Sequence, residues 1–402
     1  RQEQKLTFTR TVEAPPAEVY RAFTHPVALR SWLCEVAEVD PRAGGRFYIA
    51  WDNGYYTAGE YTELQRNERV GFTWRGPHDP EHGEVSVTLT PEGNATTVTL
   101  AHTGRGAGNA WSESAQGIRG WETALENLQS VLETGIDLRL VRRPMFGLNG
   151  ADALNAEIAA ELGVPVEEGL RLTGLAEGLP AHNAGLQPND VLVRMGDRPI
   201  RDFNSLVSVM GLHQAGDCVP ATFYRDGRQQ TVTLELSPRQ MPEVPETLEV
   251  LVEIIRRDGA AVGQELDTLI DGVTEDEAEY HPDSGGWNAK EILAHLIAQE
   301  YDGHTTIANL VADAPDDPVY YANDLVRLRP LVAAHGTLRA MAEEFKRSQR
   351  MGGEMIANMP APASERKSNV FRLGIAYANL ADHTREHFGE IKALVEARRA
   401  TS

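Results

Sequence analysis

The chain has 402 residues, more than one hydrophobic core usually holds, so about two to four domains are expected. It carries 59 acidic side chains against 38 Lys and Arg, and the resulting net charge of -21 excludes nucleic acids and anionic membranes as expected partners. Its two cysteines, Cys34 and Cys218, fall in different predicted domains, and no apolar run approaches the roughly 18 to 20 residues of a membrane span. We therefore expect a cytoplasmic protein without a disulfide framework.

Two breaks in the residue pattern divide the chain. They are the basic stretch LRLVRRP at 138–144 and the proline-rich stretch SPRQMPEVP at 237–245. Because each break separates segments of different periodicity, we predict a multidomain α+β protein with domains at residues 1–138, 142–238 and 245–400.

The first segment alternates apolar and polar residues as β-strands do, in the stretches GGRFYIAW, ERVGFTW, VSVTLT and TTVTLAH. A helix is predicted after Pro15-Pro16. A longer helix closes the segment, with one apolar stripe formed by Ile118, Trp121, Leu125, Leu128 and Leu132. These elements predict a curved antiparallel sheet wrapped on a helix, which encloses a cavity.

The order of a strand, APPAEVYRAFTHPVALRSWL, a meander and a helix opening GWETALENL resembles the START-like (SRPBCC) superfamily. Within it, the segment is most similar to the branch named for the activator of the heat-shock chaperone ATPase. The resemblance covers residues 1–138 and implies a helix-grip fold that binds a small apolar ligand between sheet and helix. The candidate lining residues are Trp32, Trp51, Trp74 and Trp111. The alternative is that these tryptophans simply fill the core.

The middle segment contains PAHNAGLQPNDVLVRMGDRPIRDFNSLVSVM and then ATFYRDGRQQTVTLEL, where Asp226-Gly227 predicts a hairpin turn. It resembles the permuted PDZ domain of bacterial HtrA proteases, a small β-barrel or sandwich. In that family an apolar-Gly-apolar loop binds a peptide C-terminal carboxylate through backbone amides. The residues that occupy this place are Met145, Phe146, Gly147 and Leu148, and the predicted groove residues of the short helix are Leu206 and Met210.

Two departures from the PDZ pattern leave a second interpretation open. Asn149-Gly150 stands where an apolar strand is usual, and Asn189 replaces the glycine common before Asp190. The alternative to peptide binding is a spacer between the neighbouring domains. The sequence contains neither a G-x-S-x-G elbow nor a Walker phosphate loop.

The last segment predicts helices that carry histidines on their inward faces. His383 and His387 are four residues apart in NLADHTREHFGEIKALVE, on one helical stripe with Leu373, Ala376, Leu380, Ile391 and Leu394. His295 lies in WNAKEILAHLIAQE, a helix that we expect Asn288 and Glu291 to cap, with Ile292, Leu296 and Gln299 on its own side. We expect His281, His304 and His335 at the surface.

Three imidazoles from two helices predict a site for one divalent transition metal with an open coordination position. The alternative is that buried histidines only satisfy backbone carbonyls. A tryptophan opening the second helix, a histidine within it and a His-x-x-x-His pair in the fourth resemble the DinB-like four-helix bundles, over about 155 residues. The resemblance implies that His295, His383 and His387 bind the metal, with zinc or nickel preferred over iron or manganese. It also implies a low-molecular-weight thiol as a partner, because several branches are thiol-dependent transferases or isomerases.

Two functional hypotheses follow from this sequence. The first is a metal-dependent thiol S-transferase or hydrolase acting through the third domain, although neither Glu291 nor Glu386 is assigned as its acid or base. The second is a non-enzymatic sensor or scaffold that binds a small apolar ligand in the first domain and a peptide C-terminus in the second.

Overall fold

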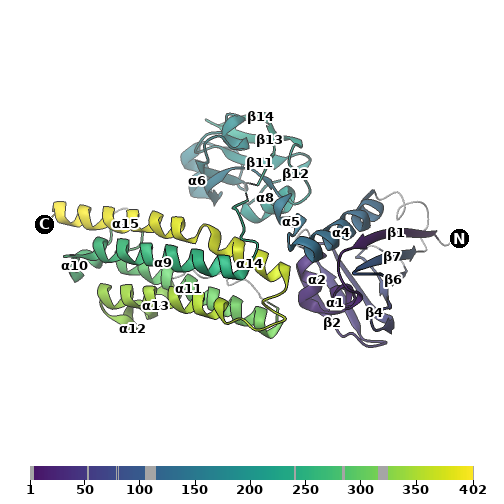
Figure 1. The fold of residues 1–402 in the computed structure, drawn as a ribbon. Coiled ribbons are helices and arrows are strands. Elements are labelled where there is room, and N and C mark those ends of the chain that lie inside the picture. The colour runs from purple at the N-terminus through teal and green to yellow at the C-terminus, as the bar shows by residue number, and fades with distance from the viewer. Residues whose placement is uncertain are drawn as a thin grey trace. The chain divides into compact units, whose positions relative to one another are not determined.

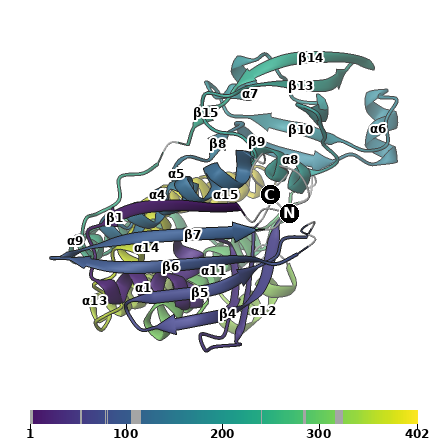
Figure 2. The same ribbon diagram turned by 90° about the vertical axis from the view of Figure 1, so that its right-hand side faces the viewer.

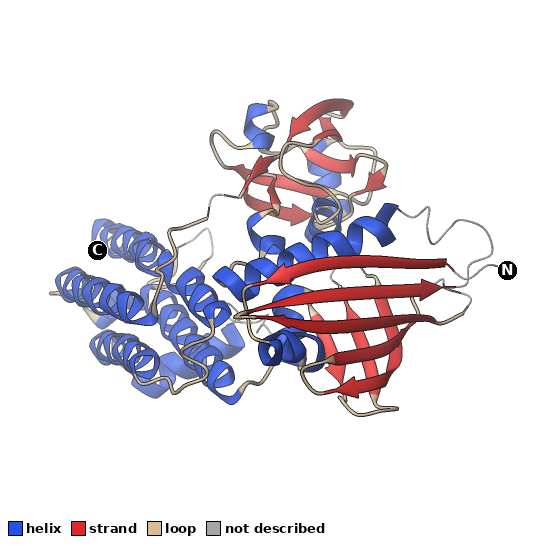
Figure 3. Ribbon diagram, turned by 45° about the vertical axis from the view of Figure 1, so that its right-hand side comes forward, coloured by secondary structure: helices blue, strands red, loops and turns tan. Residues whose placement is uncertain are grey.

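A computed structural model of the chain describes residues 4–51, 54–77, 79, 81–104, 115–239, 241–282, 286–315 and 325–401 (Figure 1). The chain forms two compact units, Arg1–Met241 and Pro242–Ser402. Strands occur throughout the first unit, whereas the second is helical (Figure 3). This is the multidomain α+β architecture that the sequence predicted. In the described ranges, none of the helices combines the length and the apolar character that crossing a membrane requires.

A seven-stranded antiparallel sheet forms the first domain. Its order is β1-β7-β6-β5-β4-β3-β2, a meander in which the first strand pairs with the last. The strands are β1 Gln4–Val12, β2 Val36–Val39, β3 Arg46–Ala50, β4 Tyr56–Gln65, β5 Arg69–Trp74, β6 Gly83–Glu92 and β7 Ala95–Gly104. The accompanying helices are α1 Pro16–Thr24, α2 Pro26–Trp32, α4 Ala115–Thr134 and α5 Leu138–Val141.

The helices α1 and α4 lie on one side of this sheet (Figure 2). As predicted from the stripe on α4, Trp121, Leu125 and Leu128 are buried in the core against the inward-facing side chains of the sheet. Aromatic rings fill much of that core, and Phe47 stacks on Phe72 with ring centroids 4.2 Å apart. The helix-grip arrangement therefore rests on burial of one helical stripe against one sheet face.

The second domain is a small β domain with short helices. Its main sheet has the order β14-β13-β11-β10-β9, with β12 paired to β11, and β8 pairs with β15. The strands are β8 Pro144–Met145, β9 Leu148–Ala153, β10 Leu170–Leu175, β11 Val191–Met195, β12 Arg198–Pro199, β13 Cys218–Arg225, β14 Arg228–Glu235 and β15 Ser237–Pro238. The helices are α6 Ala156–Leu162, α7 Pro180–Asn183 and α8 Phe203–Met210.

Two turns of this domain use left-handed backbone. Asp226 and Gly227, with φ of 50° and 71°, form the predicted hairpin turn between β13 and β14. Asn189 has φ of 74°, so the asparagine occupies a conformation that favours glycine and that asparagine tolerates better than most residues. The departure noted in the sequence at this position thus preserves the turn.

The second unit is a bundle of long helices that lie side by side (Figure 1). They are α9 Leu248–Ile270, α11 Ala289–Ala312, α12 Leu325–His335, α13 Leu338–Ala357, α14 Lys367–Ala378 and α15 Leu380–Thr401, with a short α10 Glu275–Ala278. The predicted cap of α11 is present: Glu291 N donates to Asn288 Oδ1 and Asn288 N donates to Glu291 Oε2, at 2.9 and 3.1 Å. This capping box sets where α11 begins and therefore which residues face inward.

One detail of the predicted bundle is wrong. The stripe from Leu373 to Leu394 was predicted on one continuous helix, but the chain leaves the helix at Asn379, which has ψ of 10°, and α15 begins at the next residue. Asparagine has low helix propensity because its side chain competes for backbone hydrogen bonds. As a result Leu373 and Ile391 join different apolar clusters of the bundle.

A layer of polar side chains from α11, α13 and α14 lies between these two apolar clusters. It consists of Glu300, His304, Ser348, Gln349 and Tyr377, and we call it the polar layer. Glu300 is 3% exposed and hydrogen-bonds the Gln349 side chain. Burial raises the pKa of this carboxyl to about 7.

We predict that Glu300→Gln stabilises the bundle at pH 8 much more than at pH 5. The wild-type carboxyl has a raised pKa in the folded state, so its neutral form is favoured there and the stability it contributes is lost as pH rises through about 7. Above that pH the buried charge lowers the free energy of unfolding by roughly 3 kcal/mol, and a neutral glutamine does not have this effect. Urea unfolding of the full chain followed by circular dichroism at 222 nm measures the difference.

The matched control is Glu253→Gln, an exposed residue of α9. It should change the free energy of unfolding little at either pH. An equal effect of Glu300→Gln at both pH values would contradict a carboxyl that titrates between them.

Candidate metal centre

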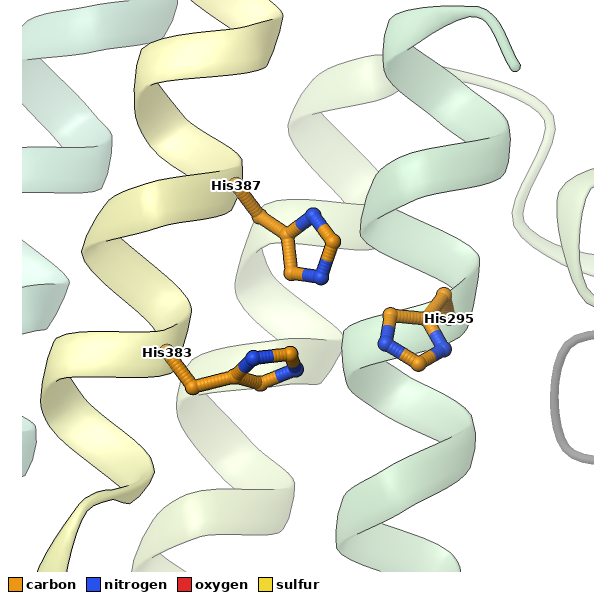
Figure 4. A group of neighbouring side chains, drawn as sticks. All are labelled: His295, His383 and His387. Atoms are coloured by element: carbon orange, nitrogen blue, oxygen red, sulfur yellow. The ribbon is translucent and has the colours of Figure 1, made fainter. Parts of the chain in front are cut away.

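Two helices bring the three predicted histidines together. His295 is on α11, two turns after its capping box, and is 3% exposed. His383 and His387 are one turn apart on α15 and are partly buried. Figure 4 shows the rings converging on the space between these helices.

The geometry of the three rings suits one metal ion. One ligand nitrogen from each ring can be chosen so that all lie within 4.8 Å of one another. The ring centroid of His295 lies 5.8 Å from that of His383 and 5.0 Å from that of His387. The centroids of the two rings on α15 are 4.6 Å apart. Nitrogens about 2.1 Å from a tetrahedral ion would be about 3.4 Å apart, so small side-chain rotations would bring the rings to bonding distance.

Other side chains orient these rings. His387 donates from Nδ1 to Glu390 Oε2 at 2.9 Å, which leaves its Nε2 for a metal, in the arrangement that holds metal-bound histidines in other proteins. Gln299 Nε2 lies 3.2 Å from His383 Nε2. The Trp287 ring packs on His295 with centroids 5.3 Å apart. The donor set therefore fits a divalent metal with three imidazole ligands.

The electrostatics favour the neutral form of His383, the form that a metal requires. Burial, reinforced by the nearby His387, lowers the pKa of His383, and Glu386 and Glu390 offset only part of this effect. A neutral imidazole is the form that ligates, so binding does not first have to remove a tightly held proton.

An apolar groove of about 360 Å³ lies beside the histidines. Its lining residues are Trp287, Ile292, Glu390, Ala393, Leu394 and Ala397. Trp287 contacts His295 and Glu390 contacts His387, so the groove adjoins the site on both of its helices. A substrate in the groove would place its apolar part next to the histidines.

The surface position predicted for two other histidines is wrong for one of them. His304 was predicted at the surface, but it is buried in the polar layer and donates from Nε2 to the Ser348 carbonyl at 2.9 Å. His281 is exposed and donates to Glu291 Oε2 at 3.0 Å. Because Glu291 also closes the capping box, it is engaged in holding the start of α11.

The tryptophans proposed for a ligand cavity pack within the first domain. Trp32 and Trp74 are buried, and Trp51 is half-buried against the same cluster. Trp32 donates to the Ala22 carbonyl at 2.9 Å and Trp51 to the Leu33 carbonyl at 2.6 Å. Trp111 lies outside the described residues. Ligand binding by this domain stays a prediction.

The predicted peptide-binding residues sit at the start of β9 and on α8. Met145 pairs with Ser237, Phe146 is buried in the core, Gly147 has φ of 95°, and Leu148 opens β9. Leu206 is buried in the same core, and Met210 packs against its edge. The exposed apolar residues of α8 are instead Phe203 and Val207.

Neither Glu390 nor Glu300 was predicted from the sequence as a functional residue. Glu390 follows His387 by three residues, a helical spacing at which a carboxylate reaches a ring, so this signal was available. Glu300 had no such signal, because its burial depends on helices far away in the sequence.

Comparisons with known proteins agree with these features. Residues 13–133 match the family of Activator of Hsp90 ATPase homolog 1-like proteins, residues 135–236 match the PDZ domain, and residues 260–391 match the DinB superfamily. A serine protease Do-like HtrA of Lactococcus lactis subsp. lactis is 33% identical over 101 residues, which are 24% of this chain and 25% of that protein. The periplasmic serine endoprotease DegP of Escherichia coli is 28% identical over 120 residues, or 30% of this chain and 24% of that protein. The matches thus span about a quarter of these curated relatives.

Among solved structures, a protein from Mesorhizobium loti has 26% identity and a TM-score of 0.30, covering 32% of this chain and 97% of its own. An HSP90 activator from Plasmodium falciparum has 26% identity and a TM-score of 0.28, covering 32% and 96%.

The fold and the histidine cluster define a multidomain α+β protein that contains a domain of a metal-binding helical family. More particularly, the chain carries, in order, an Hsp90-ATPase-activator-like helix-grip domain, a PDZ domain and a DinB-superfamily domain.

We predict that Glu390→Gln weakens zinc binding about 10- to 100-fold, because the carboxylate that orients His387 and strengthens its ring as a ligand is replaced by a neutral amide. Competition with a chromophoric chelator measures the affinity. The full chain should take up about one equivalent of zinc, and a triple variant with His295, His383 and His387 changed to Ala should take up none.

Glu386→Gln is the matched control, since it removes an exposed carboxylate from the same turn of α15. Equal losses in the two glutamine variants would indicate a general charge effect rather than orientation of His387.

Proposed function

We propose that this chain is a cytoplasmic, metal-dependent S-transferase that uses a low-molecular-weight thiol. The observation that carries the proposal is the convergence of three imidazoles, with ligand nitrogens within 4.8 Å, beside an apolar groove. Zinc or nickel suits this donor set best, with iron and manganese as alternatives. The thiol is inferred from the resemblance to thiol-dependent members of the DinB-like bundles.

The roles of the chain's own residues follow from their contacts. When bound at the three histidines, a divalent metal would supply a positive charge that lowers the pKa of a thiol or water. Glu390 fixes the orientation of His387. The groove wall formed by Trp287, Ile292 and Leu394 removes water from an apolar electrophile and holds it near the histidines.

We expect the zinc- or nickel-loaded full chain to consume thiol in the presence of an electrophile at least tenfold faster than the triple histidine-to-alanine variant. A panel of glutathione, cysteine and other small thiols with monobromobimane provides the assay. Removal of metal with EDTA should abolish the excess rate, and added zinc or nickel should restore it.

Equal rates for wild type and triple variant would reject the transferase. Metal-dependent turnover of ester or amide substrates without loss of thiol would instead establish the hydrolase.

A second candidate function is peptide binding by the PDZ domain. The observation that favours it is the loop at Gly147, where φ is 95° and an added Cβ would lie 2.4 Å from Leu179 Cβ, so only glycine fits. The carbonyl oxygens of Gly147 and Phe146 accept hydrogen bonds from the backbone amides of Ala176 and Ala181. Because a carbonyl and the amide that follows it point in opposite directions, the amides of the loop face away from these partners. Phe203 and Val207, 53% and 40% exposed on α8, provide an apolar surface for a peptide side chain.

We predict that peptides ending in a free apolar carboxylate bind the full chain at least tenfold more tightly than their C-terminal amides. Fluorescence anisotropy with a fluorescein-labelled set, one for each apolar last residue, measures this. Val207→Glu should abolish binding, because it places a charge on the apolar surface. Val250→Glu, at an exposed position of α9, should not. No binding, or no preference for the carboxylate, would favour the spacer.

A further inference from the structure

A glutamine reaches across from α11 to one of the proposed metal ligands. Gln299 follows His295 by four residues, so both side chains leave the same face of the helix toward α15. Its amide nitrogen lies 3.2 Å from His383 Nε2. Its Oε1 is buried and, among the described residues, has no hydrogen-bond partner. An unsatisfied buried carbonyl is unfavourable, which points to a hydrogen-bond donor from outside the chain, such as the O–H of a bound water or hydroxide.

The contact bears on which nitrogen of His383 carries the proton. With the amide oriented as in the structure, Gln299 Nε2 donates, so His383 Nε2 accepts and the ring proton lies on Nδ1. The Glu390 carboxylate imposes the same tautomer on His387 by accepting from its Nδ1. Both rings of α15 therefore present Nε2 lone pairs, the state that a metal binds.

The amide also occupies the place that a ligated ion would take. A metal bonds a histidine nitrogen at about 2.0 to 2.1 Å along its lone pair, and the Gln299 amide nitrogen lies 3.2 Å from that same atom of His383. The amide must move aside when an ion enters. Because it is anchored one turn from His295, it remains within reach of the coordination position that the three imidazoles leave open.

We propose that Gln299 is a positioning residue of the metal centre: it keeps His383 Nε2 unprotonated before metal binding and afterwards donates a hydrogen bond to the fourth, exogenous ligand. This inference rests on the proposed metal centre but not on thiol transfer. The ligand is a hydroxide or a thiolate: the amide N–H donates to either anion without adding charge, and Oε1 can in addition accept from the hydroxide O–H. A glutamate would repel the same ligand.

The first test uses metal-free full chain and nitrogen-15 NMR of the histidine side chains. In the wild type, the His383 ring should show the form protonated at Nδ1. In Gln299→Ala, that ring should become a mixture of both tautomers, while His387 keeps its form through Glu390. A His383 spectrum that does not change with the substitution would overturn the first half of the proposal.

The second test uses cobalt(II) as the probe, because its visible spectrum reports the fourth ligand. Titration with pH gives the midpoint at which bound water ionises, and titration with 2-mercaptoethanol gives the affinity for a thiolate. Gln299→Ala should raise the midpoint by about one pH unit and weaken the thiolate about tenfold, the effect of losing one hydrogen bond to a charged group. Gln299→Glu should shift both further in the same direction.

Gln264→Ala is the control, since it removes an exposed glutamine from α9. Unchanged cobalt spectra, midpoint and thiolate affinity in Gln299→Ala would overturn the second half of the proposal. A wild-type chain that takes up no cobalt, zinc or nickel would overturn it together with the metal centre. Spectral shifts as predicted in a protein without transferase activity would reject the enzymatic function and leave the role of Gln299 intact.

Discussion

The meeting of three imidazoles in the partly apolar space between α11 and α15 is the constraint on which the proposed site depends. A polar ring placed in an apolar interior is stable only when its nitrogens have partners, and a second positive ring nearby makes protonation harder still. Each ring consequently has a defined neighbour: Trp287 packs on His295, Gln299 contacts His383, and Glu390 accepts from His387. These neighbours hold the rings in the orientation in which their nitrogens converge.

The local structure around the site serves this arrangement. The capping box at Asn288 determines where α11 begins, and so directs His295 toward α15. The break at Asn379 lets α15 start independently of α14, which frees the histidine pair from the direction of the preceding helix. Helix ends one or two turns from the histidines thereby control the placement of the ligands.

The bundle contains more buried polarity than folding alone would favour. The polar layer with Glu300 lies between two apolar clusters, and its carboxyl becomes charged only above about pH 7. Glycines 303 and 352 face the Tyr377 hydroxyl, and an added Cβ would come within 3.3 and 3.0 Å of it. Such features reduce stability and persist when the rest of a core supports them. The two domains of the first unit have apolar cores of their own, and the three histidines with their neighbours all belong to the second unit.

The sequence by itself determined the three-domain order, the capped start of α11 and the helical faces of the histidines, because strand alternation, helix caps and i,i+4 spacing are local properties. It also placed Gln299 on the face of His295. Tertiary structure decided the burial of His304 and Glu300, the break of the predicted stripe at Asn379, and the meeting of Gln299 with His383 across 84 residues. These depend on the distance between helices that are remote in sequence, and no local pattern encodes that distance.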